Sequence, residues 1–405
     1  MAELTPSNAP RQPDDLAGAL VARPGLACPA SLQSTRREWA PVLARGRPAS
    51  ALPGLLSAVY ALCGGAHRWT SAAAVAAARG AAAPPTAADR GALQADTLRE
   101  HLRRIWLDWP RVLPLLSGDA PDPAALATCP LLLAPRGEQG QQDQQDLRAV
   151  HAAARAWVEQ ALLGRPAAAW WTGWCQGGIG FVRDWAWTEQ TVAAVWLRAA
   201  DAALGDAAVP CRPLSAVADG MAEAAMRGLA ARLRTEPAFA LHPDWQGLPC
   251  ETGPWARWAD GGPTGALPVF HRLAARLAEV AALLLDDGDQ RLAQGGLALG
   301  AGEGIAWCEM ARGLLVHWVQ LRPGLGADGT PVVECCRVIA PTEWNFHAGG
   351  ALAQALAQSP ADLPDTTLRL MAAAFDPCVA LSIERPATPH AQPAHPANED
   401  PRCTR

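Results

Sequence analysis

The feature that most constrains the fold is a change of residue pattern near Gly304. Before it, apolar residues recur at helical spacing in four long segments, 91–109, 147–163, 215–233 and 269–285. After it, the segments 314–321 and 332–340 are apolar or β-branched runs with several glycines between them. Helical spacing predicts amphipathic helices, and two such runs around a Gly-rich segment predict a β-hairpin. The pattern therefore predicts an α+β fold that is mostly helical, with a small C-terminal hairpin or sheet.

Other segments have a local preference of their own. Small and apolar residues predict two helices between 52 and 82, interrupted at Cys63-Gly64-Gly65. Segment 170–187 holds five Trp around Gly-Gly-Ile-Gly, whose spacing is not that of a dinucleotide-binding motif, so we expect an aromatic-packed loop. The remaining predictions are short helices at 351–358 and 366–374, a final strand at 378–383 and an exposed polar loop at 136–146.

The length and the ends of the chain suggest its domain organisation. At 405 residues it can bury a sizeable core in one large domain. Residues 385–405 are rich in Pro, Ala and His and have too little apolar surface to pack. We therefore expect a flexible leader at 1–27, a single domain at 28–384 and a disordered tail at 385–405.

Charge and cysteine usage exclude several classes of protein. The net charge is −5 and no basic run is present, so we expect no nucleic-acid partner. No Lys occurs in the chain, which excludes a P-loop lysine and a Schiff-base lysine. The eleven Cys are an odd number without a Cys-x-x-Cys pair, which argues against a disulfide framework and indicates a reducing compartment.

The N-terminus and the length of the apolar runs indicate where in the cell the protein is expected. The N-terminus is polar and lacks the apolar core of a signal peptide. No apolar run approaches the roughly 20 residues that a membrane-spanning helix needs. We therefore expect a cytoplasmic protein without a membrane segment.

Four short segments carry residues that suit a metal site. They are Leu62-Cys63-Gly64-Gly65-Ala66-His67-Arg68, Glu309-Met310-Ala311-Arg312-Gly313 with His317-Trp318, Ala340-Pro341-Thr342-Glu343-Trp344-Asn345, and Phe375-Asp376-Pro377-Cys378. In this order they resemble four elements of nickel–iron hydrogenase large subunits. Those elements are Ile-Cys-Gly-x-Cys with a following His, Glu-Ala-Pro-Arg-Gly with a following His-Trp, Val-Pro-Thr-Thr-Trp-Asn, and Asp-Pro-Cys-x-x-Cys-x-x-His. The middle of the chain, 68–302, has no match.

The chain departs from the large subunits at three telling positions. Leu381 stands for the second Cys of the C-terminal motif, Glu384 for its His, and Ala66 for the second Cys of the N-terminal element. A chain that keeps the frame but loses half of the metal thiolates resembles the HupK/HoxV family, accessory proteins for assembly of the hydrogenase iron cofactor. The resemblance implies a large-subunit-like fold and a protein that is not an enzyme.

The resemblance also implies a ligand set. In large subunits two Cys pairs hold nickel, and two of those thiolates bridge to an iron that carries cyanide and carbon monoxide. Cys63 and Cys378 match the first Cys of each pair, while Arg312, Pro341 and Thr342 match the shell that holds the cyanides. Because the N-terminal element is shorter than the family pattern, His67 is a further candidate ligand, with a structural role as the alternative. We expect a transient iron with cyanide and carbonyl ligands and no nickel, since two thiolates cannot satisfy it.

These implications lead to one function and two alternatives. The implied function is a non-catalytic scaffold that receives or shelters the iron group for the apo hydrogenase large subunit, with a HypC-type chaperone as a second partner. The alternatives are a divergent hydrogenase and a metal-free decoy that only binds the chaperone. The lost thiolates argue against the first, and the retained Arg312, Pro341, Thr342 and Cys378 argue against the second.

Overall fold

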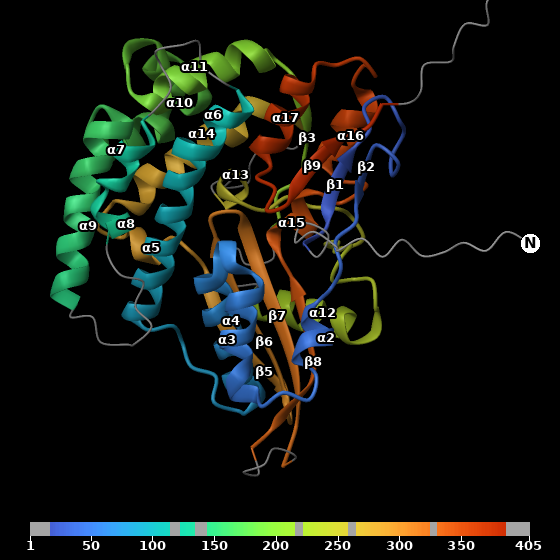
Figure 1. Ribbon diagram of the computed structural model, residues 1–405. Coiled ribbons are helices and arrows are strands. Elements are labelled where there is room, and N and C mark those ends of the chain that lie inside the picture. The colour runs from blue at the N-terminus through green and yellow to red at the C-terminus, as the bar shows by residue number, and fades with distance from the viewer. Residues whose placement is uncertain are drawn as a thin grey trace, which may run out of the picture.

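The computed structural model describes residues 17–113, 122–133, 144–214, 222–257, 265–324 and 330–385. Its elements form a helical region and, below it in Figure 1, a four-stranded sheet with helices on both faces. The helices and the small C-terminal sheet confirm the predicted α+β class.

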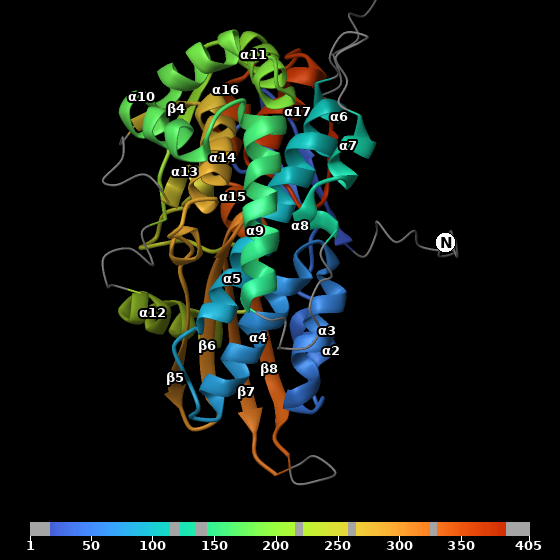
Figure 2. The ribbon, with the colours of Figure 1, turned by 90° about the vertical axis from the view of Figure 1, so that its left-hand side faces the viewer.

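The larger sheet is antiparallel throughout, with strand order β5-β6-β7-β8. Its strands are β5 (Gln294–Gly300), β6 (Glu303–Met310), β7 (Gly313–Arg322) and β8 (Val332–Ile339). The last two are the predicted hairpin, which β5 and β6 extend. Nearly every residue of β6 and β7 is buried, because helix α4 covers one face and α12 the other (Figure 2). Strands covered on both faces are continuous apolar runs instead of alternating ones.

Two helices separated by a sharp bend form the cover on one face. They are α3 (Leu52–Val59) and α4 (Gly64–Ala78), joined by the 3₁₀ turn η2 (Ala61–Cys63), as the small apolar residues predict. The Thr70 hydroxyl of α4 donates a hydrogen bond to Cys308 Sγ of β6, 3.2 Å away. One end of α4 therefore lies beside Gly304 and the other, with Cys63, approaches the β6–β7 turn.

No single helix of the described residues has both the length and the hydropathy of a membrane span. The segments Ala49–Val59 and Ala61–Ala78 meet both criteria only when counted together, across a bend of 103°.

The helical region is built around α14 (Val269–Leu283), in which every residue except His271 is buried. Its neighbours include the other helices expected from apolar spacing, α5 (Ala87–Arg103) and α9 (Gln144–Val158). The fourth predicted helix, α12 (Ala222–Thr235), lies on the sheet instead. Trp109 and Trp196 stack in this core with ring centroids 4.4 Å apart.

The segment expected as an aromatic-packed loop is a helix. It is α10 (Ala167–Thr188), and inside it Gly178 alone leaves helical backbone geometry, with φ +53° and ψ −133°. Trp170 and Trp185 are buried and meet edge to face, 5.6 Å apart. The loop prediction is wrong because burial of these indole rings against neighbouring helices outweighs the low helix propensity of the glycines.

A three-stranded sheet joins the two ends of the described chain. Strand β1 (Ala19–Ala22) pairs antiparallel with β2 (Leu32–Ser34) and parallel with β9 (Ala380–Ile383), which is the predicted final strand. The predicted flexible leader 1–27 is therefore wrong for 19–22, where Leu20 is fully buried. Four apolar residues suffice for a strand when both edges find partners. Residues 1–16 and 386–405 of the predicted leader and tail lie outside the described residues.

The remaining elements connect these parts. Those around the helical region are η3 (Arg104–Asp108), α6 (Trp109–Val112), α7 (Pro123–Ala127), α8 (Pro130–Leu133), η4 (Glu159–Leu163), α11 (Val192–Leu204), α13 (Pro254–Arg257), η5 (Gly288–Gln290) and α17 (Asp365–Ala374). The others are α2 (Ala40–Ala44), η1 (Ala49–Ala51), β3 (Ala208–Cys211), β4 (Gly265–Pro268), α15 (Pro341–Asn345) and α16 (Ala351–Gln358). Helices α16 and α17 match their predicted positions. Of the predicted loop 136–146, residues 144–146 belong to α9 and the rest lie outside the described residues.

Candidate functional site

Four segments from distant parts of the chain meet where the sheet joins the helical region (Figure 1). Cys63 precedes α4, Arg312 lies in the turn between β6 and β7, Thr342 lies in α15, and Cys378 precedes β9. The charges of Arg312 and Cys378 act on the Cys63 thiol, and Thr342 is hydrogen-bonded to Cys378. The structure therefore brings together four of the six residues predicted as metal or cofactor ligands.

Cys63 is the N-cap residue of α4. Burial raises the pKa of its thiol to about 12, while the positive charge of Arg312 acts in the opposite direction. A helix N-terminus and a nearby guanidinium both favour the thiolate, the form that binds metals. The Cys63 thiol therefore keeps its proton at neutral pH until a metal displaces it.

Cys378 has two polar partners at its sulfur. Thr342 Oγ1 lies 2.9 Å from Cys378 Sγ, and Arg36 Nη1 donates a hydrogen bond to the same sulfur over 3.4 Å. Thr342 is held in place because Pro341, buried and suited to the first turn of a helix, begins α15. The sulfur is thus held by two polar side chains, of which Arg36 donates a hydrogen bond to it.

Arg312 sits in a tight hairpin turn that requires a glycine. Met310 pairs with Gly313 across the turn, and Gly313 has φ +131°. A Cβ at Gly313 would lie 2.3 Å from the Thr252 side chain, so only Gly fits. The chain reversal directs the Arg312 guanidinium into the protein, where it is buried.

The Arg312 guanidinium has unused donors. Its Nη1 lies 3.2 Å from Glu100 Oε2, and its Nε lies 3.7 Å from Asp376 Oδ1. Neither nitrogen makes a hydrogen bond to any part of the protein that the structure describes. Buried donors that lack a well-formed hydrogen bond are costly even beside carboxylates, so this guanidinium suits a further anionic or lone-pair acceptor such as a cyanide nitrogen.

Asp376 organises the loop before Cys378, a role that sequence patterns did not indicate. Its carboxylate is paired with Arg104 at 2.5 Å, Arg276 at 2.7 Å and Arg312 at 3.7 Å. Although burial opposes it, these guanidinium charges lower the pKa of Asp376 well below its usual range. Asp376 also has φ +60°, an unusual backbone conformation that Asp tolerates. The loop is therefore fixed by charge pairing with two helical segments, η3 and α14, and with the β6–β7 turn.

His67 contacts His317 and Tyr60, whereas a third metal ligand would be expected to face Cys63. Its Nδ1 lies 3.0 Å from His317 Nε2, and its ring stacks on Tyr60 with centroids 4.1 Å apart. Burial lowers the pKa of both imidazoles, that of His317 to about 3, so both rings are neutral. Within the described ranges, no three His, Cys, Asp or Glu side chains form a metal-ligand group. This geometry fits the structural alternative for His67.

The other thiols of the sheet lie in the core. Cys308 and Cys336 are fully buried, and Cys335 is partly buried. Burial raises the pKa of Cys308 to about 12, although the Thr70 hydrogen bond acts against this. Trp318, in the segment that carries His317, is buried and donates to Glu303. Cys308, Cys336 and Trp318 are therefore core residues of the sheet region.

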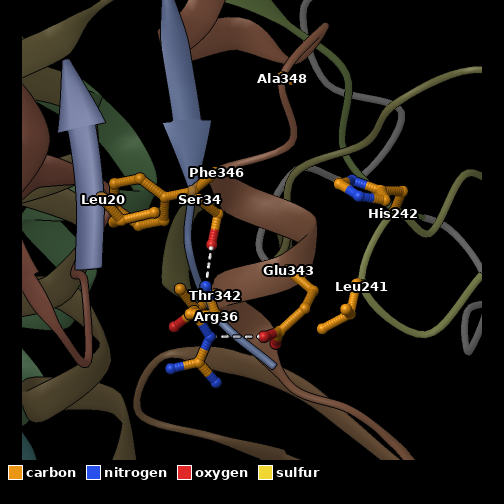
Figure 3. A pocket seen from close by; sticks show the side chains of 9 residues that line it. All are labelled: Leu20, Ser34, Arg36, Leu241, His242, Thr342, Glu343, Phe346 and Ala348. Atoms are coloured by element: carbon orange, nitrogen blue, oxygen red, sulfur yellow. Dashed lines mark hydrogen bonds and ion pairs between the residues drawn. The ribbon is translucent and has the colours of Figure 1, made fainter. Parts of the chain in front are cut away.

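A small cavity of about 40 Å³ lies beside the Cys378 shell. Figure 3 shows its lining, with the Arg36 side chain directed toward the Glu343 carboxylate and Thr342 next to them. Arg36 Nε donates to Glu343 Oε1 over 2.7 Å. Both Arg36 and Thr342 line the cavity and contact the sulfur, so the cavity is separated from Cys378 by these two side chains.

A buried charge network connects the site to the helical region. Arg276 Nη1 lies 3.1 Å from His101 Nδ1, and His101 Nε2 lies 2.6 Å from Glu279. Arg257 donates to both oxygens of Glu279. Arg257 also lies 3.8 Å from Glu309. Burial raises the pKa of Glu309 to about 7, although the charge of Arg257 acts to lower it. The network thus links Asp376, through Arg276, His101 and Arg257, to the buried carboxylates Glu279 and Glu309.

Sequence patterns missed the residues that support the ligands. Arg36 belongs to none of the four motifs that resemble the family, and no local pattern separates it from its neighbour Arg37. Glu343 offered a signal, because an acidic residue stands inside an otherwise matched apolar motif. A buried carboxylate needs a cationic partner, and Arg36 is that partner.

Chemically, the site offers two thiols, a hydroxyl and buried guanidinium donors around one point. Soft thiolates bind iron, and hydrogen-bond donors suit diatomic anions on that iron. The Arg312 nitrogens that make no hydrogen bond in the described structure, together with the two thiols, fit an iron–cyanide–carbonyl group as a bound substrate.

Sequence comparison finds hydrogenase expression/formation proteins. The chain is 39% identical over 389 residues to the protein HoxV of Cupriavidus necator, which covers 91% of this chain and 96% of that protein. It is 33% identical over 359 residues to HupK of Bradyrhizobium diazoefficiens, with coverage of 85% and 90%. No protein-family model matches the chain.

Comparison with solved structures finds hydrogenases. Two chains of the nickel–iron–selenium hydrogenase of Desulfovibrio vulgaris Hildenborough superpose with TM-scores of 0.55 and 0.52. They are 15% and 14% identical and cover 86% and 89% of this chain, and 92% and 93% of their own length. At such identities the likeness shows the fold, which is that of a hydrogenase large subunit.

Proposed function

The chain belongs to the HupK/HoxV family of hydrogenase expression/formation proteins, and we propose that it is a scaffold for the iron group of a nickel–iron hydrogenase. In this proposal Cys63 and Cys378 hold an iron that carries two cyanides and one carbonyl. Arg312, Pro341 and Thr342 surround the cyanides. The chain passes the group to the apo large subunit and does not itself turn over hydrogen.

The observation that carries the proposal is the convergence of the two thiols with donors that make no hydrogen bond in the described structure. Thr342 already contacts the Cys378 sulfur, and Arg312 acts on the Cys63 thiol. The guanidinium of Arg312 keeps two buried nitrogens without hydrogen bonds in the described structure. A neutral small molecule would leave the thiols unused, whereas an iron–cyanide–carbonyl group uses both kinds of residue.

The number of thiolates separates this scaffold from a hydrogenase. Leu381 and Ala66 stand at the positions of the two missing thiolates, and His67 faces His317. Two thiolates are too few for nickel in addition to iron. We therefore propose that the chain binds no nickel, and that its partners are a HypC-type chaperone that delivers the group and an apo large subunit that receives it.

Infrared spectroscopy tests the proposal, because bound cyanide and carbonyl absorb where proteins do not. The protein is purified without oxygen from a host that assembles hydrogenase. We expect cyanide and carbonyl bands in the wild type and none in Cys378→Ser. The matched control is Cys308→Ser, a buried thiol directed at Thr70, which keeps the bands. Full bands in Cys378→Ser, or nickel near one atom per chain, would contradict the proposal.

A further inference from the structure

We propose that Arg36, oriented by Glu343, supplies the positive charge that lets Cys378 hold the iron group. The inference rests on the proposed function and assigns a positioning residue that lies outside the predicted ligand set. It also gives Glu343 a role: its carboxylate orients the Arg36 guanidinium and partly offsets the positive charge that acts on the Cys378 sulfur.

The contacts place the Arg36 guanidinium between the Glu343 carboxylate and the Cys378 sulfur. Arg36 Nε donates to Glu343 Oε1 over 2.7 Å, and Arg36 Nη1 donates to Cys378 Sγ over 3.4 Å. The side chain of Arg36 is 12% exposed and that of Glu343 is 6% exposed. Figure 3 shows the guanidinium turned toward Glu343, with Thr342 beside it. A planar guanidinium can serve both partners at once, whereas an ammonium group cannot do so with the same geometry.

The backbone fixes the origin of the Arg36 side chain. The Arg36 amide donates to Ser34 Oγ at the end of β2, over 3.2 Å. Strand β2 is paired with β1, and β1 with β9, which follows Cys378. Arg36 and Cys378 are therefore mounted on the same small sheet, so their separation is set by paired strands.

Charge balance explains why a cation is needed at this sulfur. An Fe²⁺ with two cyanides and one carbonyl is neutral. When two thiols bind it, two iron–sulfur bonds form, two S–H bonds break, and two protons leave, with no change of oxidation state. The loaded site is therefore more negative than the empty one by two charges. Buried negative charge requires nearby cations.

The two cations of the site differ in their partners. Arg312 faces two carboxylates, Glu100 and Asp376. Among the described residues, Arg36 forms its ion pair with Glu343 and also contacts the sulfur directly. The neighbouring charges of Glu343 and Cys378 raise the pKa of the Arg36 guanidinium, although burial opposes this. Arg36 is thus a cation that donates a hydrogen bond directly to the Cys378 sulfur.

Removing the cation and removing its anionic partner should have opposite effects if Arg36 acts through its charge, and not if it only supports the structure. Arg36→Gln removes the cation, so we expect retained iron to fall about tenfold, the size of one charge-assisted hydrogen bond. The remaining carbonyl band should move to lower frequency, because a thiolate without its cation donates more electron density to iron. Glu343→Gln keeps an oxygen for Arg36 but removes the opposing charge, so the band should move to higher frequency.

Two further variants complete the experiment. Arg37→Gln is the matched control, since Arg37 is the next residue and is exposed; it should leave iron content and bands unchanged. Arg36→Lys keeps the charge and should restore part of the iron. It also keeps the test usable if Arg36→Gln does not fold, as judged by circular dichroism.

The outcomes distinguish this inference from the proposed function. A wild-type protein without cyanide and carbonyl bands would overturn both. Wild-type bands together with an Arg36→Gln variant of normal iron content and band position would overturn the role of Arg36 alone. Shifts of the same sign in Arg36→Gln and Glu343→Gln would also overturn it, because a charge effect requires opposite signs.

Discussion

At the scale of single residues, the site depends on charges that are buried and paired. Asp376 is held by three arginines, and the nearest of them, Arg104, also donates to the Pro377 carbonyl over 2.8 Å. Both contacts fix the backbone immediately before Cys378. In the proposed function Cys378 is thus already oriented by its loop, so binding the iron group would cost little reorganisation. The hydroxyl of Thr342 then completes the shell at the sulfur.

Removing only the Thr342 hydroxyl should change the cyanides and spare the carbonyl. Thr342→Val has nearly the same shape but cannot donate a hydrogen bond. We expect both the iron and the carbonyl band to persist, while at least one cyanide band shifts. Thr342→Ser keeps the hydroxyl and is the control, with bands near those of the wild type. Unchanged cyanide bands in Thr342→Val would remove Thr342 from the cyanide shell.

Glu309 should make stability depend on pH near neutrality. Burial raises its pKa in the folded protein from 4.5 to about 7. The folded state therefore holds the proton more tightly than the unfolded state, and this stabilisation is complete below pH 4.5 and lost as the pH rises through 7. The shift corresponds to about 3 kcal/mol of unfolding free energy.

Glu309→Gln should remove that dependence, because glutamine is neutral at every pH. Urea unfolding at several pH values measures it. We expect the free energy of unfolding of the variant, relative to the wild type, to increase by roughly 2–3 kcal/mol between pH 5 and pH 8. Parallel curves for the two proteins would show that Glu309 has no raised pKa.

At the scale of elements, the packing of α4 on the sheet positions Cys63. A Cβ at Gly304 would lie 2.4 Å from Ala78 N and 2.5 Å from Ala74 O. Helix and strand therefore approach each other as closely as their backbones allow. This contact anchors the far end of α4, while the Thr70–Cys308 hydrogen bond lies nearer to Cys63.

Gly304→Ala should destabilise the protein, because the contact atoms belong to the backbone and cannot turn away. We expect a loss of about 1–3 kcal/mol in the free energy of unfolding, the usual cost of overpacking. Gly300→Ala in the adjacent strand β5 is the control, since its Cβ would meet open space. Equal stability of the two variants would contradict the close packing of α4 on β6.

The elements that sequence patterns predicted correctly are those with a strong local signal. The two runs of β7 and β8, helices α14 and α16, and strand β9 all carry such a signal. Strand β5 was missed because Gly295 and Gly296 weaken strand propensity, and pairing with β6 overrides this. Strand β1 was missed because its partner β9 is more than 350 residues away.

The residues of the site also divide into those with a local sequence signal and those without one. Cys63, Arg312, Thr342 and Cys378 were predicted because each stands in a short motif that resembles a family element. Their supporting residues carry no such motif. Arg36 and Arg104 become recognisable only through the carboxylates that they contact, Glu343 and Asp376. Those contacts depend on tertiary structure, and no local pattern of residues reveals them.

At the scale of the whole molecule, the site is where the two ends of the chain are joined. Cys63 begins the helix that covers the large sheet, and Cys378 precedes the strand that pairs with β1. A metal held by both would link the sheet region to the helical region across most of the sequence. Binding to the folded state alone also stabilises it, so a loaded protein should unfold at a higher temperature than an empty one.

The coordination of iron by both cysteines is the central claim, and X-ray absorption at the iron edge tests it most directly. The sample is protein purified without oxygen from a host that assembles hydrogenase. The account predicts two sulfur neighbours per iron, together with light atoms from linear diatomic ligands, and one sulfur fewer in Cys63→Ser. Iron with four sulfur neighbours, or iron whose sulfur count is unchanged in both Cys63→Ser and Cys378→Ser, would contradict it.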